Sequence, residues 1–75
     1  MKISDKEFKL FAQKMALNLK KYRNDIPLTQ EQCAEKIGIE YKYYQRIEQA
    51  DANITMKTLY KICKTLDINP RDLFE

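Results

Sequence analysis

Apolar side chains recur at helical spacing along most of this chain, and no segment alternates as a strand would. In the first segment, which begins with Ser4 as a helix cap, one apolar stripe repeats every three or four residues. Its members are Phe8, Phe11, Ala12, Met15, Leu19 and Tyr22. Residues so spaced share one face of a helix, and we expect this face in the core. The turn at residues 24–27 ends the helix, because Pro27 cannot continue it.

Capping residues and one glycine define the next two helices. Thr29 can cap the first of them, and Gln32 can complete a capping box. Gly38 is the only glycine of the chain, and it stands where a helix that stops sharply needs a residue with positive φ. The flanking apolar or small positions are Cys33, Ala34, Ile37, Ile39, Tyr44 and Ile47. Residues 29–48 therefore predict two helices that cross closely, with Ala34 at the nearest approach of their backbones.

The remaining pattern predicts two more helices and completes an all-α fold of five. A polar loop at residues 49–53 precedes a helix capped by Thr55. The apolar face of that helix is Met56, Leu59, Ile62, Cys63 and Leu66. A last short helix follows Asn69 as cap and Pro70 as first residue. We expect residues 1–75 to form a single domain.

Composition narrows the possible functions. A chain of 75 residues with 44% apolar and 33% charged residues is globular but holds only a modest core. The net charge of +3 permits nucleic-acid binding without requiring it. Histidine is absent from the sequence, which excludes imidazole bases and histidine metal sites. With no glycine-rich phosphate loop and no cluster of metal ligands either, we expect no enzyme activity, no cofactor and no metal.

The two cysteines and the hydropathy bear on the compartment. Cys33 and Cys63 both lie on predicted apolar faces, so free core thiols are expected, with a disulfide or a reactive thiol as the alternative. The first six residues contain no apolar run typical of a signal peptide. No stretch approaches the roughly 20 apolar residues of a membrane span. We therefore expect a cytoplasmic protein without membrane contact.

With these residues in place, the chain resembles the phage-repressor family of helix-turn-helix domains, the Cro and lambda-repressor type. The resemblance covers about residues 8–74, with the helix-turn-helix motif at about 29–48. The matching positions are Arg23, Leu28, Thr29, Gln30, Ala34, Ile37, Gly38, Ile47, Glu48, Asn53, Leu59, Leu66, Ile68, Leu73 and Phe74. Residues 53–59 are also similar to the controller proteins of restriction–modification systems. The resemblance implies a five-helix lambda-repressor-like domain that regulates transcription by binding DNA.

The resemblance also implies which residues contact DNA. In the family the second helix of the motif lies in the major groove and reads base edges. The positions that this assigns to base reading are Tyr41, Lys42, Gln45 and Arg46. Their alternative role is a solvated polar face. The positions that it assigns to phosphate contacts are Thr29, Gln30, Gln49, Asn53 and Lys57.

The family pattern also contains an ion pair, which Arg23 and Glu48 match here. We expect it to be mainly structural, with an additional phosphate contact of Arg23 as the alternative. Four departures from the pattern matter, and one of them is Ile54, which replaces a frequent proline. Ala50 replaces the usual glycine, so the end of the second motif helix is expected to be strained or differently shaped. Tyr44 replaces an aliphatic core residue, so its hydroxyl must reach a partner or solvent. Glu40 replaces a serine or threonine at the start of that helix.

Two functions remain open on these residues. The first is a regulator that binds double-stranded DNA, at a pseudo-palindromic site, as a homodimer paired through the C-terminal helix. The second is an antitoxin-like or regulatory module whose main partner is another protein. Phe74 is the candidate anchor of the dimer, and its alternative is to fold back onto the first helix.

Overall fold

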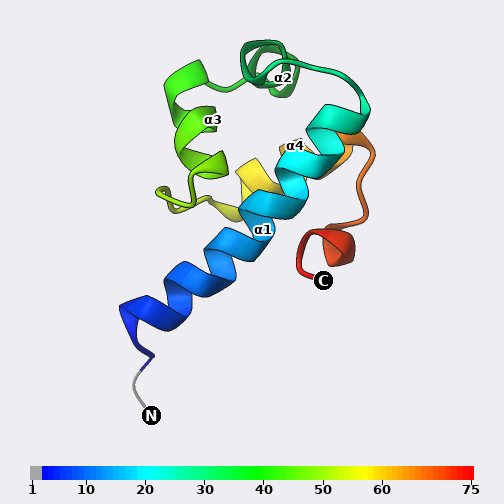
Figure 1. Cartoon of the computed structure of the whole chain (residues 1–75). Helices are drawn as coiled ribbons and strands as arrows, with labels where there is room; N and C mark the ends of the chain where they lie inside the picture. Colours follow the sequence, from blue (N-terminus) through cyan, green and yellow to red (C-terminus); the bar gives the residue numbers. More distant parts are fainter. Residues whose placement is uncertain (1–2) are drawn as a thin grey trace.

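Four α-helices and one short 3-10 helix make up the computed structural model, which describes residues 3–75 (Figure 1). Within that range no residue is in a β-strand. The elements in chain order are α1 (Asp5–Asp25), α2 (Gln30–Ile37), α3 (Tyr41–Glu48), α4 (Met56–Leu66) and η1 (Pro70–Leu73). The all-α prediction is thus confirmed.

The predicted count of five helices is met only in part, because the last element is a 3-10 helix of four residues. Asn69 caps it as expected, since its side chain accepts a hydrogen bond from the backbone N–H of Arg71, and Pro70 is its first residue. An α-helical bond joins residues four apart, so a four-residue segment closes the tighter 3-10 pattern instead.

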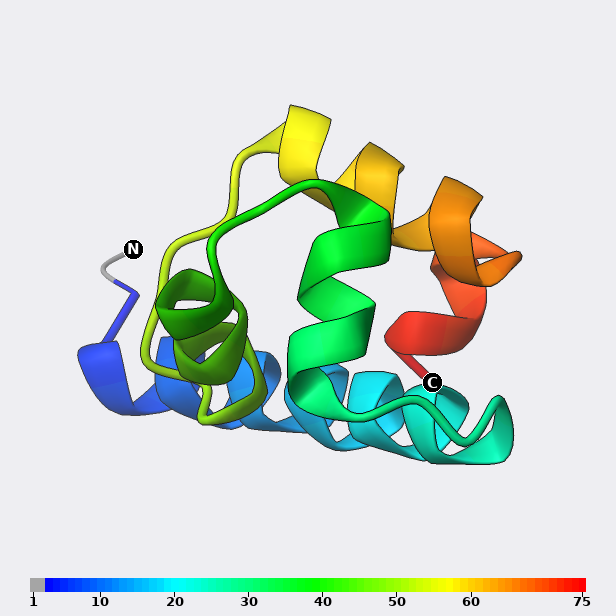
Figure 2. The same cartoon turned by 90° about the horizontal axis from the view of Figure 1, so that it is seen from above.

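Helices α1 and α4 lie on opposite sides of the molecule, and α2 spans the space between them (Figure 2). Helix α3 packs against α1 and α2, while η1 packs against α1 and α4. Two bonds hold η1 and the α3–α4 loop onto α1. The Asn18 amide donates to the Leu73 carbonyl at 2.9 Å, and Lys9 Nζ donates to the Ala50 carbonyl at 2.8 Å.

The main core lies where the four α-helices and η1 meet. Its buried members are Met15, Leu19, Cys33, Ala34, Ile37, Tyr44, Ile47, Ile62, Cys63, Leu66, Ile68 and Leu73. A second small cluster joins Ala12 and Ala16 of α1 to Ala50. Both cysteines are free and buried, as the pattern predicts.

Three residues expected in the core lie outside it. Phe8 and Phe11 remain 52% and 54% exposed, because the N-terminal turns of α1 extend past the other helices (Figure 1). Met56 is 82% exposed in the first turn of α4, off the centre of the face that α4 buries. The ring of Phe74 stacks on Phe11, with 5.2 Å between the ring centroids. Phe74 therefore takes the alternative expected for it, which is to fold back onto α1.

Candidate nucleic-acid interface

The turn between α2 and α3 is fixed by local hydrogen bonds. The Thr29 hydroxyl accepts from the Gln32 N–H at 3.1 Å, and the Gln32 side chain accepts from the Thr29 N–H at 3.0 Å, which completes the capping box. Gly38 has φ 85° and donates its N–H to the Ala34 carbonyl at 2.9 Å. The left-handed glycine ends α2 and starts the turn into α3, so these residues set the angle between the two helices.

Helix α3 has one buried and one exposed face. Tyr44 and Ile47 are 0% and 1% exposed on the core side. The residues expected to read bases lie on the other side: Tyr41, Lys42 and Arg46 are exposed, and Gln45 is partly exposed. Together they offer ammonium, guanidinium, amide and hydroxyl groups, which are the groups that hydrogen-bond to base edges in the major groove.

Two contacts already orient side chains on this exposed face. Gln45 Nε2 donates to the Tyr41 hydroxyl at 3.2 Å. Arg46 donates Nε and Nη2 to the carbonyl of Asp51, at 3.2 and 2.9 Å, and so holds the loop that follows α3. A guanidinium has five N–H donors, so three remain on Arg46.

A buried ion pair connects α3 to α1. Arg23 donates Nε to Glu48 Oε2 at 2.6 Å and Nη2 to Glu48 Oε1 at 3.0 Å, in a bidentate pair. The two side chains keep only 9% and 2% of their exposure. Arg23 Nη1 also donates to the Leu28 carbonyl at 2.8 Å, which secures the chain just before α2.

Two further side chains donate hydrogen bonds to the carboxylate of this ion pair, and the sequence pattern predicted neither contact. Gln30 Nε2 donates to Glu48 Oε1 at 3.0 Å, and the Tyr44 hydroxyl donates to Glu48 Oε2. We call Arg23, Gln30, Tyr44 and Glu48 the Glu48 network. The only sequence signal for it was the tyrosine at an aliphatic position, whose hydroxyl needed a partner. That partner could not be named before the packing of α2 on α3 was known.

The protonation of the Glu48 network follows from these contacts. Burial raises the pKa of Glu48, but hydrogen bonds from Arg23, Tyr44 and Gln30 lower it by more, so the pKa lies below its ordinary value of 4.5. The hydrogen bond to Glu48 raises the pKa of Arg23. Burial is the main cause that raises the pKa of Tyr44 far above its usual range. At neutral pH the network therefore holds an ionised Arg23–Glu48 pair and a neutral phenol.

The residues expected at phosphates are distributed around α3. Thr29 and Gln30 lie at the start of α2, Gln49 is the C-cap of α3, Asn53 is in the loop, and Lys57 is in the first turn of α4. The hydroxyl of Thr29 is engaged in the capping box, and the backbone carbonyl of Asn53 accepts from the Tyr43 hydroxyl at 3.3 Å. Gln49, Asn53 and Lys57 are exposed.

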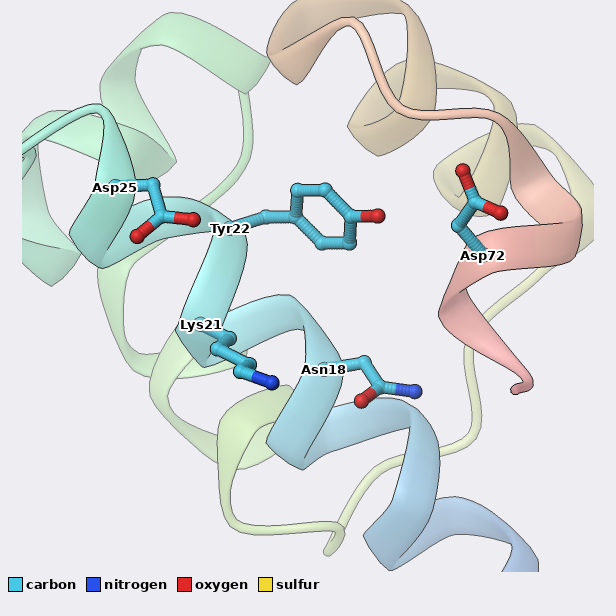
Figure 3. Close-up of a pocket in the computed structure, with 5 residues that line it drawn as sticks. All are labelled: Asn18, Lys21, Tyr22, Asp25 and Asp72. Carbon is cyan, nitrogen blue, oxygen red and sulfur yellow. The ribbon is translucent and has the colours of Figure 1, made fainter.

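A polar hollow lies elsewhere, between α1 and η1 (Figure 3). Asn18, Lys21, Tyr22 and Asp25 line it from α1, and Asp72 lines it from η1. The Tyr22 ring extends from α1 toward Asp72. Across residues 3–75, no three cysteine, aspartate or glutamate side chains come together as metal ligands would. In the same range, no helix has the length and apolar character needed to cross a membrane.

Comparison with known proteins agrees with this arrangement. Residues 19–73 match the helix-turn-helix family, and the chain belongs to this family of DNA-binding transcription regulators. Control protein C.SmaI from Serratia marcescens is 38% identical over 53 residues, which are 71% of this chain and 63% of that protein. The chain thus spans less than two thirds of the length of this curated relative.

Two solved structures are also similar. The crystal structure of the restriction-modification controller protein C.AhdI from Aeromonas hydrophila has a TM-score of 0.79 and 30% identity, over 84% of this chain and 96% of that one. An HTH_3 family transcriptional regulator from Vibrio cholerae has a TM-score of 0.81 and 25% identity, over 89% of this chain and 38% of that one. The family and the similarity to controller proteins, both expected from the residues, are confirmed.

Proposed function

We propose that this protein is a sequence-specific transcription regulator that binds double-stranded DNA as a homodimer, with α3 of each subunit in the major groove. The observation that carries the proposal is the exposed face of α3, where Tyr41, Lys42, Gln45 and Arg46 present groups that can hydrogen-bond to base edges. Two buried side chains, Tyr44 and Ile47, hold that helix to the core. The similarity to C.SmaI and C.AhdI favours control of a restriction–modification system.

Phosphate contacts would fix the register of α3 in the groove. Gln30, Gln49, Asn53 and Lys57 are the proposed donors, and Thr29 contributes through its position at the start of α2. In the capping box the Thr29 N–H donates to Gln32 and the Thr29 hydroxyl oxygen accepts from the Gln32 N–H, so the hydroxyl O–H is the donor that remains for a phosphate. The free buried thiols fit a reducing cytoplasm, where we place the protein.

The dimer is proposed to form along α4 rather than at Phe74. Phe74 contacts Phe11 of its own chain, whereas Met56 and Tyr60 on α4 are 82% and 63% exposed. These two residues border an apolar groove, which continues to Cys63, Ile68 and Pro70. One small domain reads few base pairs, and two-fold pairing doubles the sequence that is read.

The groove along α4 also favours a second candidate function. An antitoxin-like or regulatory module whose main partner is another protein needs an exposed apolar surface, and this groove supplies one. Such a module does not need hydrogen-bond donors along α3, which is why DNA binding remains the first proposal.

Selection of bound sites from a random DNA library tests the proposal. We expect a pseudo-palindromic sequence to be enriched, with half-sites one DNA turn apart, about 34 Å. Four to eight phosphate contacts per dimer would give a slope of log affinity against log salt of about −4 to −7. Lys57→Ala should reduce that slope by about 1 per half-site, while Lys20→Ala, on α1, serves as the control. A flat salt response, or no enriched sequence, would contradict DNA binding and favour the protein-binding module.

A further inference from the structure

The carboxylate of Glu48 is saturated with hydrogen bonds. Oε1 accepts from Arg23 Nη2 and Gln30 Nε2, and Oε2 accepts from Arg23 Nε and the Tyr44 hydroxyl. The three donor residues belong to three different helices, α1, α2 and α3. An ionised carboxylate offers about four acceptor sites, so all of them are in use.

This saturation fixes the orientation of the Gln30 amide. An ionised carboxylate only accepts hydrogen bonds, so Nε2 and not Oε1 must face Glu48. Turning the amide over would place its carbonyl oxygen against Glu48 Oε1 and leave two acceptors in contact. One N–H of the amide is therefore given to Glu48, and the second N–H remains for another acceptor.

The charge balance of the network also suits a nearby phosphate. A lone carboxylate beside Gln30 would repel DNA, but Arg23 neutralises Glu48 through two hydrogen bonds. Gln30 is partly exposed, whereas the Glu48 side chain is 2% exposed and Tyr44 is 0% exposed. Within this network, Gln30 is thus the member that can reach a ligand while Glu48 and Tyr44 stay inside.

We infer that Glu48 and Tyr44 are positioning residues for a contact between the Gln30 amide and a DNA backbone phosphate. This inference rests on the proposed DNA-binding function and deepens it. Glu48 holds the amide with its second N–H available, and Tyr44 keeps the carboxylate in place from the core side. The network thereby turns a flexible glutamine into a donor of fixed direction, which lowers the entropy lost on binding.

A double-mutant cycle that includes the DNA tests this inference. Single backbone phosphates of the selected site are replaced in turn by neutral methylphosphonates, and the affinity of each DNA is measured. We expect Gln30→Ala to weaken binding by about three- to tenfold and to lose its sensitivity to one phosphate in each half-site. Tyr44→Phe, which removes only the buried hydroxyl, should reduce sensitivity at the same phosphate. In the Gln30→Ala background Tyr44→Phe should have almost no further effect.

Tyr43→Phe is the matched control, because the neighbouring hydroxyl donates to the Asn53 carbonyl and not to Glu48. Its effect should add to that of Gln30→Ala. Circular dichroism at the temperature of the binding assay confirms that each variant is folded, and an unfolded Tyr44→Phe is replaced by Glu48→Gln. Additive effects of Tyr44→Phe and Gln30→Ala would overturn the inference, as would Gln30→Ala keeping the wild-type phosphate profile. A wild-type protein that binds no selected DNA would overturn the proposed function itself.

Discussion

The turn between α2 and α3 depends on the backbone conformation of Gly38. An added Cβ would meet no atom within 4 Å, so the cost of replacing this glycine comes from the backbone at φ 85° alone. We expect Gly38→Ala to lower the free energy of unfolding by about 1–2 kcal/mol, and Gly38→Val by more, because a β-branched residue is a true outlier there. Urea unfolding measures both. Gly38→Asn is the control, since asparagine tolerates this region, and an unchanged midpoint for Gly38→Val would contradict the left-handed turn.

Within residues 3–75, two residues other than glycine share this left-handed conformation. Ala50 has φ 57° and Asp67 has φ 54°. We expected alanine at position 50 to strain or reshape the end of α3. The structure agrees, because Ala50 adopts a left-handed backbone that residues other than glycine rarely adopt. The methyl group of Ala50 is buried against Ala12 and Ala16, and burial of a methyl group contributes about 0.8 kcal/mol. That packing offsets part of the backbone cost, which is about 1–2 kcal/mol.

The ionised carboxylate of Glu48 makes the stability of the fold depend on pH. Its pKa is lowered in the folded protein, so its contribution is complete above the ordinary value of 4.5 and is lost as the pH falls through the folded value. We expect the melting temperature to fall below about pH 4.5, and Glu48→Gln to flatten this fall. Glu35→Gln, an exposed change on α2, is the control. Equal pH profiles for wild type and Glu48→Gln would contradict the role of the ionised carboxylate.

At the scale of elements, the sequence predicted what local chemistry determines. The caps Ser4, Thr29, Thr55 and Asn69 each accept a backbone N–H, and α2 ends at Gly38. The spacing of apolar residues also identified which face of each helix turns inward. It could not identify which part of that face is covered, so Phe8, Phe11 and Met56 were wrongly expected in the core. Coverage depends on where the neighbouring helices end, which spacing does not encode.

The residues of the candidate interface could be predicted only in part. Spacing along a helix shows which side chains share a face, but not which distant side chains they contact. Spacing alone placed Tyr41, Lys42, Gln45 and Arg46 on one side of α3, opposite Tyr44. The bond of Gln30 to Glu48 and that of Arg46 to the Asp51 carbonyl depend on tertiary packing. Such contacts join side chains whose distance follows only from the complete fold.

Arg46 tests whether α3 reads bases. Because three of its N–H groups are not engaged by Asp51, it can hold the loop and still donate to a guanine. We expect Arg46→Ala to weaken binding by about 1–3 kcal/mol per half-site and to relax discrimination at one base pair. Affinities for all single-base variants of the selected site measure this, with Lys57→Ala as a control that should weaken all sites alike. Unchanged ratios for Arg46→Ala would assign it to the loop only.

At the scale of the whole molecule, assembly determines how α3 meets DNA. We expect the wild type to be a dimer at micromolar concentration in sedimentation experiments. The double change Met56→Ser with Tyr60→Ser should shift it to monomer, because it removes the exposed apolar border of the α4 groove. Leu10→Ser with Leu17→Ser is the matched control, since these leucines are 59% and 67% exposed on α1. A monomeric wild type would contradict the dimer.

Phe74→Ala separates the two interfaces that the chain could use. If Phe74 serves mainly to hold η1 on α1 through its stacking with Phe11, the variant should dimerise as the wild type does but unfold at a lower temperature. A loss of dimer without loss of stability would return Phe74 to the interface.

The bond between Asn18 and Leu73 has a consequence for the order of folding. It joins residues 55 apart in the chain, whereas the Arg23–Glu48 bonds span 25. Closing a longer loop costs more entropy, and contacts distant in sequence slow folding. We therefore expect α1, α2 and α3 to assemble first around the Glu48 network, and η1 to dock afterwards. The nucleus of folding would then contain α2 and α3, the two helices that carry the residues proposed to read bases and the Gln30 phosphate contact.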